Sequence, residues 1–199
     1  MLGEEDVLRL LRTGTAAEHD DVERTLDLLD PSLSRARLAH VLDLMHGFWR
    51  AAESGLDRWA DAFPVDAGTV AWPRRRRAEL FAADLRALGT AASAPLPQLP
   101  PVPGTDEALG RMYVLEGSTL GGVFIDRHLA GLLDLAGVRV RAFSPYGEET
   151  GAMWAAFRRA TRARVAGGGD SATMLASART TFAALADWCR PAAVPGVRA

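Results

Sequence analysis

Apolar residues recur at intervals of three and four along almost the whole chain, and the alternation of apolar and polar residues that marks strands is nearly absent. This spacing predicts helices over about 8–29, 34–59, 73–89, 105–135, 148–165 and 171–189. Turn-forming residues separate them, at Asp30-Pro31, at 64–72, at 94–104, at SPYG (144–147) and at Gly167-Gly168-Gly169. The sequence therefore predicts an all-α fold of about six to eight helices.

Local signals place some of the helix ends. Ser34 precedes the long apolar run and is a favoured N-cap residue. Pro73 suits the first turn of the following helix. Gly14 breaks or bends the first stripe of apolar residues, which runs on through Leu29.

The chain length and composition suit one domain. With 199 residues, of which 48% are hydrophobic, the chain can bury a sizeable core. The proline-rich stretch APLPQLPPVPG (94–104) is PPII-like, exposed and a possible linker. Because neither flank has a motif set of its own, we interpret it as a loop within a single domain over 1–199, with 191–199 as a short tail.

Charge and cysteine content narrow the function classes. The formal net charge of −2 gives no overall signal for nucleic acid, although every basic residue is arginine. The lone Cys189 excludes an internal disulfide, and the apolar run at the N-terminus is too short for an export signal. No stretch approaches the roughly 20 apolar residues of a membrane span. These features predict a cytoplasmic protein that spans no membrane.

The stretch YVLEGSTLGG (113–122) puts three glycines into a segment whose flanks are helical. Each glycine costs a helix interior about 1 kcal/mol relative to alanine. Gly117 and Gly121 stand one turn apart and Gly122 adjoins them, so a flat ligand could lie against bare backbone there. Close packing of two helices is the alternative. A phosphate-binding loop is less probable, because no strand precedes the glycines and no Lys-Ser/Thr pair follows them.

His19 lies on the first apolar stripe, one turn after Thr15 and one turn before Glu23. A neutral imidazole on such a face can ligate a metal or heme iron. Glu23 is placed to hold the other ring nitrogen. A hydrogen-bonded core histidine is the alternative. We reject Cys189 as an axial ligand, because it lies near the C-terminus and outside both motifs.

Together, TAAEHDDVE (15–23) and YVLEGSTLGG (113–122) resemble the proximal and distal helix motifs of the heme oxygenase family, in its bacterial branch. The resemblance extends over most of the chain, including SPYGEETGAMWAAF (144–157). It implies a multi-helix fold with heme between a proximal and a kinked distal helix. It also implies oxidative cleavage of heme, as substrate and cofactor, to biliverdin, carbon monoxide and ferrous iron, using O2 and external electrons.

The family's residue roles carry over to matching positions of this chain. The residues that the resemblance implies in heme binding are Arg12, His19, Glu23, Tyr113, Gly117, Gly121, Gly122, Trp154, Arg158 and Arg159. Of these, His19 ligates the iron, the glycines contact the heme face, and Arg12 and Tyr113 meet propionates. A solvated helix face is the alternative for Arg158 and Arg159.

The oxygen chemistry falls on Gly117, Gly121 and Ser118. Many family members have Asp directly after the first glycine; here that residue is Ser118, as in bacterial members with this motif. His46 and Arg77 are candidates for a proton-delivery network through ordered water. A structural or surface role is the alternative for both.

The reaction that the resemblance implies needs an electron donor such as a ferredoxin or a flavoprotein reductase. RRRR (74–77) and the arginines at 158, 159, 162 and 164 are candidate docking surfaces for an acidic donor. Ordinary solvation of these arginines is the alternative. A bilin-using photoreceptor is a candidate user of the product.

Other functions stay open at this point. A heme or bilin carrier or sensor would use the same histidine and glycines without turnover. A helical scaffold would use His19 in its core and the glycines for packing. A di-iron oxidase is weaker, because the chain has no Glu-x-x-His pair.

Overall fold

The computed structural model describes residues 6–135 and 137–190, and every regular element within these ranges is helical. The α-helices are α1 (Val7–Gly14), α2 (Ala16–Leu26), α3 (Arg35–Ala62), α4 (Pro64–Thr69), α5 (Ala78–Ala87), α6 (Thr105–Gly117), α7 (Gly122–Gly131), α8 (Thr150–Ala166) and α9 (Ser171–Cys189). The 3-10 turns are η1 (Trp72–Arg75), η2 (Ser118–Gly121), η3 (Leu133–Leu135) and η4 (Gly147–Glu149). The predicted all-α class is confirmed.

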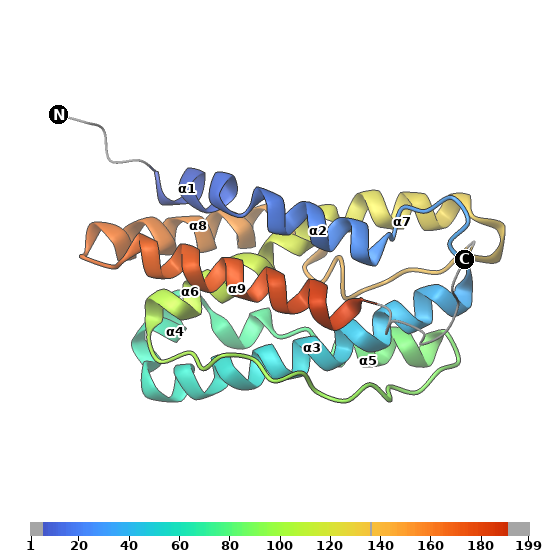
Figure 1. The fold of residues 1–199 in the computed structure, drawn as a ribbon, viewed down its shortest axis with the longest axis horizontal. Coiled ribbons are helices and arrows are strands. Elements are labelled where there is room, and N and C mark those ends of the chain that lie inside the picture. The colour runs from blue at the N-terminus through green and yellow to red at the C-terminus, as the bar shows by residue number, and fades with distance from the viewer. Residues whose placement is uncertain (1–5, 136, 191–199) are drawn as a thin grey trace, which may run out of the picture.

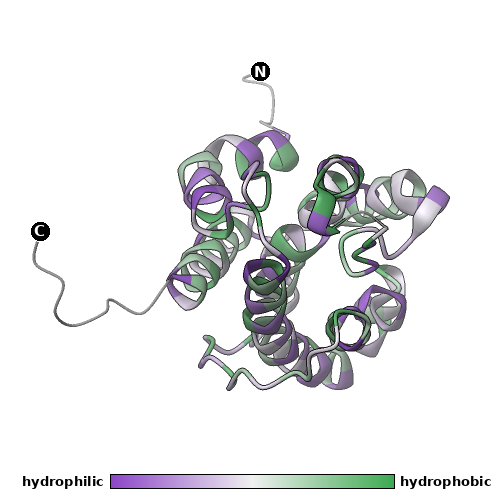
Figure 2. Ribbon diagram, turned by 90° about the vertical axis from the view of Figure 1, so that its right-hand side faces the viewer, coloured by the Kyte–Doolittle hydropathy of each residue, from purple (hydrophilic) through white to green (hydrophobic). Residues whose placement is uncertain are grey.

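Helix α9 lies in the middle of the bundle and packs against α1, α2, α3 and α6. Figure 1 shows α3 and α5 along one side of the molecule and α1, α2 and α7 along the other. Seen along the long axis, the helices surround a shared interior (Figure 2). Helix α2, which carries the histidine motif, and helix α7, which begins at the last glycine of the glycine motif, therefore lie on the same side of one bundle.

One continuous core joins the helices. Its largest fully buried apolar side chains are Trp49, Trp59, Trp72, Phe48, Phe81, Phe143 and Phe157. Each large apolar side chain that is buried contributes roughly 1.5–3 kcal/mol to stability. These side chains together therefore hold the helices in place around any site at the edge of the core. The close contact of α6 with α9 depends on Gly110, where an added Cβ would lie 2.7 Å from Ser177 Cβ.

Several predicted helix ends are confirmed and others are wrong. Ser34 caps α3, because its hydroxyl accepts a hydrogen bond of 3.2 Å from Arg37 N. The first stripe ends at Leu26 rather than Leu29, which is 55% exposed beyond the left-handed residue Asp27. Pro73 lies in a 3-10 turn and not in the helix that follows.

Helix α5 begins at Ala78 because a buried carboxylate supplies its N-terminal acceptor. Glu53 Oε1 accepts hydrogen bonds from Arg77 N at 2.6 Å and Ala78 N at 2.9 Å. A side chain from α3 thus satisfies two amides that a helix start leaves free. Such a tertiary cap leaves no local signal in the sequence, which explains the misplaced start at Pro73.

The predicted helix over 105–135 is divided into four elements, of which the first three are here called the glycine segment (105–131). Helix α6 ends at Gly117, a 3-10 turn covers 118–121, and α7 starts at Gly122 and ends at Gly131. The 3-10 turn tightens the backbone locally and changes the direction of the axis. The glycines therefore mark a bend and not a continuous helix.

The proline-rich loop connects α5 to α6 and lies along α3 (Figure 1). Asp43 accepts hydrogen bonds from Ser93 N at 2.8 Å and Ala94 N at 3.1 Å. Leu99 and Val102 pack against the core, so the loop is not the freely exposed connector that its composition indicates. The predicted tail at 191–199 lies outside the described residues. Within the described ranges, no helix has the length and apolar character to cross a membrane.

Candidate functional site

The three glycines of the motif have different surroundings. A Cβ added at Gly117 or Gly121 would meet no atom within 4 Å beyond the adjoining backbone of its own helix. One added at Gly122 would lie 2.5 Å from Ser144 Oγ and closer still to the Phe143 carbonyl oxygen. Gly117 and Gly121 therefore leave an open face of bare backbone, whereas Gly122 is required for packing against the loop behind it. The expected ligand contact of Gly122 has no support from these surroundings.

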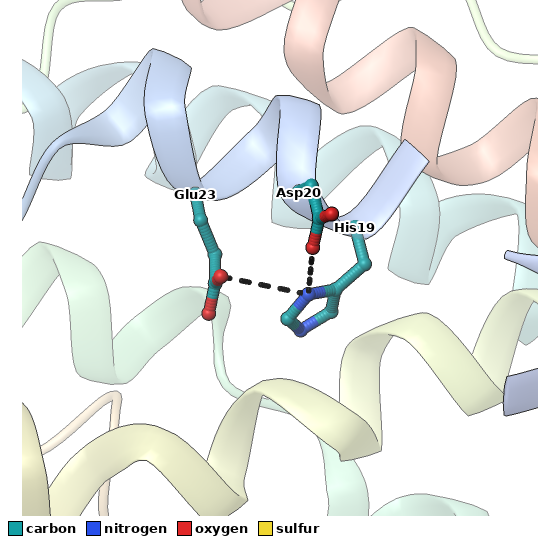
Figure 3. A group of neighbouring side chains, drawn as sticks. All are labelled: His19, Asp20 and Glu23. Atoms are coloured by element: carbon teal, nitrogen blue, oxygen red, sulfur yellow. Dashed lines mark ion pairs between the residues drawn. The ribbon is translucent and has the colours of Figure 1, made fainter. Parts of the chain in front are cut away.

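His19 projects from α2 with its side chain 53% exposed. Its Nδ1 lies 3.7 Å from Glu23 Oε2 and 4.0 Å from Asp20 Oδ1. Both distances are longer than a hydrogen bond, so the expected Glu23 bond is not formed. Figure 3 shows Nδ1 facing the two carboxylates, while the other ring nitrogen points away from them. Nε2 is therefore the ring nitrogen available to a ligand on the open side.

The rear of the His19 ring packs on the central helix. The Phe182 ring of α9 meets it edge-on, with centroids 5.7 Å apart. One residue earlier, Glu18 accepts a hydrogen bond of 2.6 Å from Arg179 of α9. These contacts fix α2 against α9 and set the direction in which His19 projects. His19 is thus neither the core histidine of the alternative interpretation nor a freely rotating surface residue.

Helix α2 is linked to the glycine segment beyond both of its ends. At one end, Tyr113 lies close enough to Thr15 for the Thr15 side chain to oppose the rise that burial causes in the pKa of the Tyr113 phenol. At the other end, His128 Nε2 lies 2.9 Å from Asp30 O. Along the chain, His19 lies between Thr15 and Asp30. Gly117 and Gly121 lie between their partners, Tyr113 and His128. The histidine and the open backbone face therefore border the same space.

An aromatic and basic group lies at the Tyr113 end of that space. The rings of Tyr113 and Trp154 have centroids 6.0 Å apart, and Trp154 stacks on Phe157 at 5.5 Å. The exposed Arg12 lies close enough for its charge to oppose the rise in the pKa of Tyr113. Three of the predicted residues, from α1, α6 and α8, are thus brought together.

Arg158 and Arg159 are placed differently. The charge of the half-buried Arg158 contributes to the lowered pKa of Asp6, after the larger effect of Arg162. Arg158 therefore lies near the start of α1, and its Nε is buried without a hydrogen-bond partner. Arg159 is exposed. Arg158 lies one turn after Trp154 on α8, but no hydrogen bond or ring contact among the described residues joins Arg158 or Arg159 to the Tyr113–Trp154 pair.

Arg77 contacts the 3-10 turn directly. Its Nη2 donates to Ser118 Oγ at 2.9 Å and to the carbonyl of Leu115, and its Nη1 donates to Ala142 O at 3.0 Å. The side chain is buried, and burial lowers the pKa of the guanidinium. The hydroxyl of Ser118 in turn donates to Leu115 O at 2.7 Å. Arg77, a predicted candidate for a water-mediated proton-delivery network, is thus in direct contact with Ser118.

His46 lies elsewhere. It is buried on α3, and its pKa is lowered by desolvation and by the charge of Arg50. The acidic groups that oppose this shift are Asp43 and Glu79. These neighbours belong to α3 and α5, so nothing in the surroundings of His46 supports a role at the 3-10 turn.

The four arginines at 74–77 do not form a basic patch, contrary to the docking hypothesis. Arg74 pairs with Glu149 at 2.7 Å and Arg76 with Asp57 at 2.6 Å, both exposed. Arg75 and Arg77 are buried instead. Arg75, predicted only as part of a docking surface, instead pairs with the buried Glu116. Tyr146, which was not predicted as a functional residue, donates its OH to Glu116 at 2.8 Å. A glutamate inside the apolar run before Gly117 was the available signal.

Two cavities lie away from this space. One of about 420 Å³ lies between α3, α5 and residues 137–140, and one of about 220 Å³ lies beneath Pro100 and Pro101. Neither is lined by His19 or by Gly117 and Gly121. The ligand atoms of His19, Asp20 and Glu23 lie within 4.8 Å of one another and could hold a metal ion by themselves. Because His19, Asp20 and Glu23 are all exposed, a ligand larger than a metal ion can also reach His19 Nε2.

The comparisons with known proteins agree with this geometry. No family model matches the chain. The chain is 31% identical over 145 residues to a heme oxygenase of Xanthomonas campestris pv. campestris (strain 8004), which covers 73% of this chain and 84% of that protein.

Solved structures show the same fold. The NO- and CO-bound heme oxygenase from Neisseria meningitidis superposes with a TM-score of 0.75 at 25% identity, covering 96% of each chain. The heme oxygenase from Leptospira interrogans superposes with a TM-score of 0.71 at 18% identity, over 93% of this chain and 98% of that chain. Given the curated relative and an open glycine bend facing an exposed histidine, the chain belongs to the heme oxygenase family.

Proposed function

We propose that this heme oxygenase cleaves heme to biliverdin, carbon monoxide and ferrous iron with O2 and external electrons. Family membership supports the reaction. The structural observation that carries the proposal is the pairing of His19 with the open backbone at Gly117 and Gly121. An imidazole on one side and bare backbone on the other suit a flat iron porphyrin between two helices.

The residues present fit heme. His19 Nε2 would hold the iron, because Nδ1 faces Asp20 and Glu23. Gly117 and Gly121 leave the approach of a macrocycle unobstructed. When bound, heme supplies both the oxygen-activating iron and the ring that is cleaved. A neutral imidazole donates less electron density to iron than a thiolate does. This suits an oxygenase whose substrate is the porphyrin ring around that iron.

Arg12, Tyr113 and Trp154 are proposed to orient heme at one edge. Arg12 is exposed near the C-terminus of α1 and carries a full positive charge toward solvent. The phenol of Tyr113, with its raised pKa, remains a hydrogen-bond donor at neutral pH. Both groups suit carboxylates, and Trp154 supplies an apolar surface beside them. We propose no heme contact for Arg158 and Arg159.

Ser118 is proposed to order water near the oxygen-binding side. Its proton is committed to Leu115 O, and Arg77 donates to its oxygen. A hydroxyl has two lone pairs, so one remains to accept a hydrogen bond from water. Arg77 acts by holding Ser118 and not by giving up a proton, because a guanidinium is always protonated in proteins.

The electrons must come from outside the chain. A ferredoxin or a flavoprotein reductase supplies electrons of the required kind, and we propose a donor of this class. The arginines at 74–77 are not its docking site, since two are buried and two are ion-paired. Arg162 and Arg164 are likewise paired, with Asp6 at 2.7 Å and Asp106 at 2.8 Å.

A heme or bilin carrier with the same site is the second candidate, because the exposure of His19 would also serve reversible binding. An absorption time course separates the two. The protein is mixed with one equivalent of hemin and then given ascorbate or a ferredoxin reducing system in air, with catalase present. Loss of the Soret band with growth of a broad red biliverdin band is expected. A Soret band that persists through many reducing equivalents would establish the carrier, and no Soret shift on adding hemin would reject both functions.

A further inference from the structure

The residue before the first open glycine is a buried carboxylate at a junction of several elements. Glu116 is 2% exposed. Its Oε2 accepts from Arg75 Nη1, and its Oε1 accepts from Tyr146 OH at 2.8 Å. We call Arg75, Glu116 and Tyr146 the buried clamp. It joins the end of α6 to η1 and to the residue that precedes η4.

Arg75 connects the clamp to two more parts of the bundle. Its Nε donates to Val70 O at 2.5 Å, and its Nη2 donates to Met153 O of α8 at 3.2 Å. The guanidinium therefore has an acceptor on each of its three nitrogens. A buried ion pair with an acceptor at every guanidinium nitrogen favours one geometry, because breaking any of these bonds leaves a buried polar group without that partner.

The clamp adjoins the loop that packs against the back of the bend, because Tyr146 lies in the same loop as Phe143 and Ser144. Behind the bend, Gly122 packs against the Phe143 carbonyl, and Ser144 Oγ donates to Asp126 at 3.3 Å. In front, Gly117 and Gly121 have no side chain with which to fix the backbone by packing. The position of the open face therefore depends on polar contacts made from behind it.

We propose that Arg75, Glu116 and Tyr146 are positioning residues that set the distance between the Gly117–Gly121 backbone and heme held on His19. This inference rests on the proposed function, and none of the three residues touches the open face itself. A ligand on iron held by His19 would lie between the metal and this backbone. A change in the clamp therefore changes the space and the polarity that the ligand meets, while the heme-binding contacts stay in place.

The phenol of Tyr146 is a dependable donor in this arrangement. Burial and the neighbouring carboxylate of Glu116 raise its pKa, so it stays protonated at neutral pH. Replacing it by phenylalanine removes one hydrogen bond and keeps the ring. Glu116 then retains Arg75 as its partner. Tyr146→Phe is accordingly the mildest change to the clamp.

The test compares Tyr146→Phe and Glu116→Gln with the wild type in the heme-loaded protein. The readouts are the CO stretching band of the ferrous CO complex, the dissociation constant of hemin, the turnover of bound heme and the ratio of biliverdin isomers. We expect the CO band to shift or broaden in both variants while hemin affinity stays within about twofold of wild type. Turnover should fall by roughly three- to tenfold, the effect of losing one hydrogen bond of about 1 kcal/mol.

Arg76→Gln is the matched control, because Arg76 lies next to Arg75 but pairs with the exposed Asp57 at 2.6 Å. It should leave the CO band and the isomer ratio unchanged. Unchanged bands and isomer ratios in a folded Tyr146→Phe protein would overturn the inference, even if Glu116→Gln fails to fold. A wild type that binds heme and never degrades it would reject the proposed function alone, since the CO bands would still test the clamp.

Discussion

Arg77 Nη2 lies 2.9 Å from Ser118 Oγ, so a buried guanidinium holds the first residue of the 3-10 turn. The same group donates to the carbonyls of Leu115 and Ala142 and lies 5.1 Å from the centroid of the Trp49 ring. Its partners are neutral oxygens and an aromatic face rather than a carboxylate. Such an arginine contributes through geometry, because its planar fork matches several acceptors at once.

Removing the Arg77 fork should therefore cost more stability than removing its hydroxyl partner. We expect Arg77→Met to lower the free energy of unfolding by about 2 kcal/mol, because buried carbonyl oxygens lose their donor. Ser118→Ala should cost about 1 kcal/mol or less, since Arg77 keeps both carbonyls. Urea denaturation of the heme-free proteins measures both values. Equal losses in the two variants would show that the hydroxyl, and not the fork, holds the turn.

The glycines at 121 and 122 should respond in opposite ways to substitution. Gly121→Leu adds a side chain in open space, so the heme-free protein should keep its fold and its stability to within about 1 kcal/mol. Its hemin affinity should fall by at least tenfold, because the leucine occupies the space of the macrocycle. Hemin titration and thermal unfolding of the same samples measure the two effects.

Gly122→Ala provides the converse control. Its Cβ would press on the Phe143 carbonyl and on Ser144 Oγ at 2.5 Å, and overpacking of this kind costs about 1–3 kcal/mol. The open face would be untouched, so hemin affinity of the folded fraction should stay near wild type. Full hemin affinity in Gly121→Leu would show that heme does not lie on this backbone.

Much of the fold and part of the site could be predicted from the sequence, because some of the determining interactions are local and others are not. Helical periodicity and the Ser34 cap are local properties, and both were predicted correctly. The start of α5 was not, because its cap is Glu53 from another helix. The spacing of Gly117, Gly121 and Gly122 indicated a special helix face, but only the packing separates Gly122 from the other two.

The burial of alternate arginines in the run 74–77 could not be predicted from the sequence. In RRRR, alternate residues point inward, because the stretch leaves η1 at Arg75 and passes through an extended residue, Arg76, before α5. Nothing in four identical letters distinguishes the buried Arg75 and Arg77 from their exposed neighbours. Their acceptors, Glu116 and Leu115, are about 40 residues away. The polar network behind the bend is thus a product of tertiary structure.

His19→Ala should abolish axial ligation and nearly all turnover. The imidazole is the ligand proposed for the iron, and its removal leaves a space above Phe182 that a small molecule can enter. Added imidazole should restore a six-coordinate or histidine-like Soret spectrum and part of the activity. Asp20→Asn, at a neighbouring exposed carboxylate 4.0 Å from Nδ1, is the control and should keep both. Wild-type spectra and turnover in His19→Ala would refute the assignment of the ligand.

Glu53 should make the heme-free protein lose stability as the pH rises. Burial raises the pKa of the Glu53 carboxyl above the ordinary value of 4.5 that it has in an unfolded chain, despite hydrogen bonds from the amides of Arg77 and Ala78. Between these two pKa values the folded state binds more protons than the unfolded state, so the free energy of unfolding falls with increasing pH. Above the folded pKa the cost is complete and constant.

Glu53→Gln should remove this pH dependence. Both amides donate to the same oxygen, Oε1, which an amide side chain reproduces without a charge. The variant should therefore be more stable than wild type at pH 7 and nearly equal to it at pH 4. Asp84, whose pKa burial also raises, contributes equally to both proteins and cancels in the difference. Urea denaturation across this pH range measures the difference. Glu79→Gln, an exposed glutamate in the first turn of α5, is the control and should follow the wild type. A constant offset between Glu53→Gln and wild type at every pH would mean that Glu53 acts through its shape alone and not through its charge.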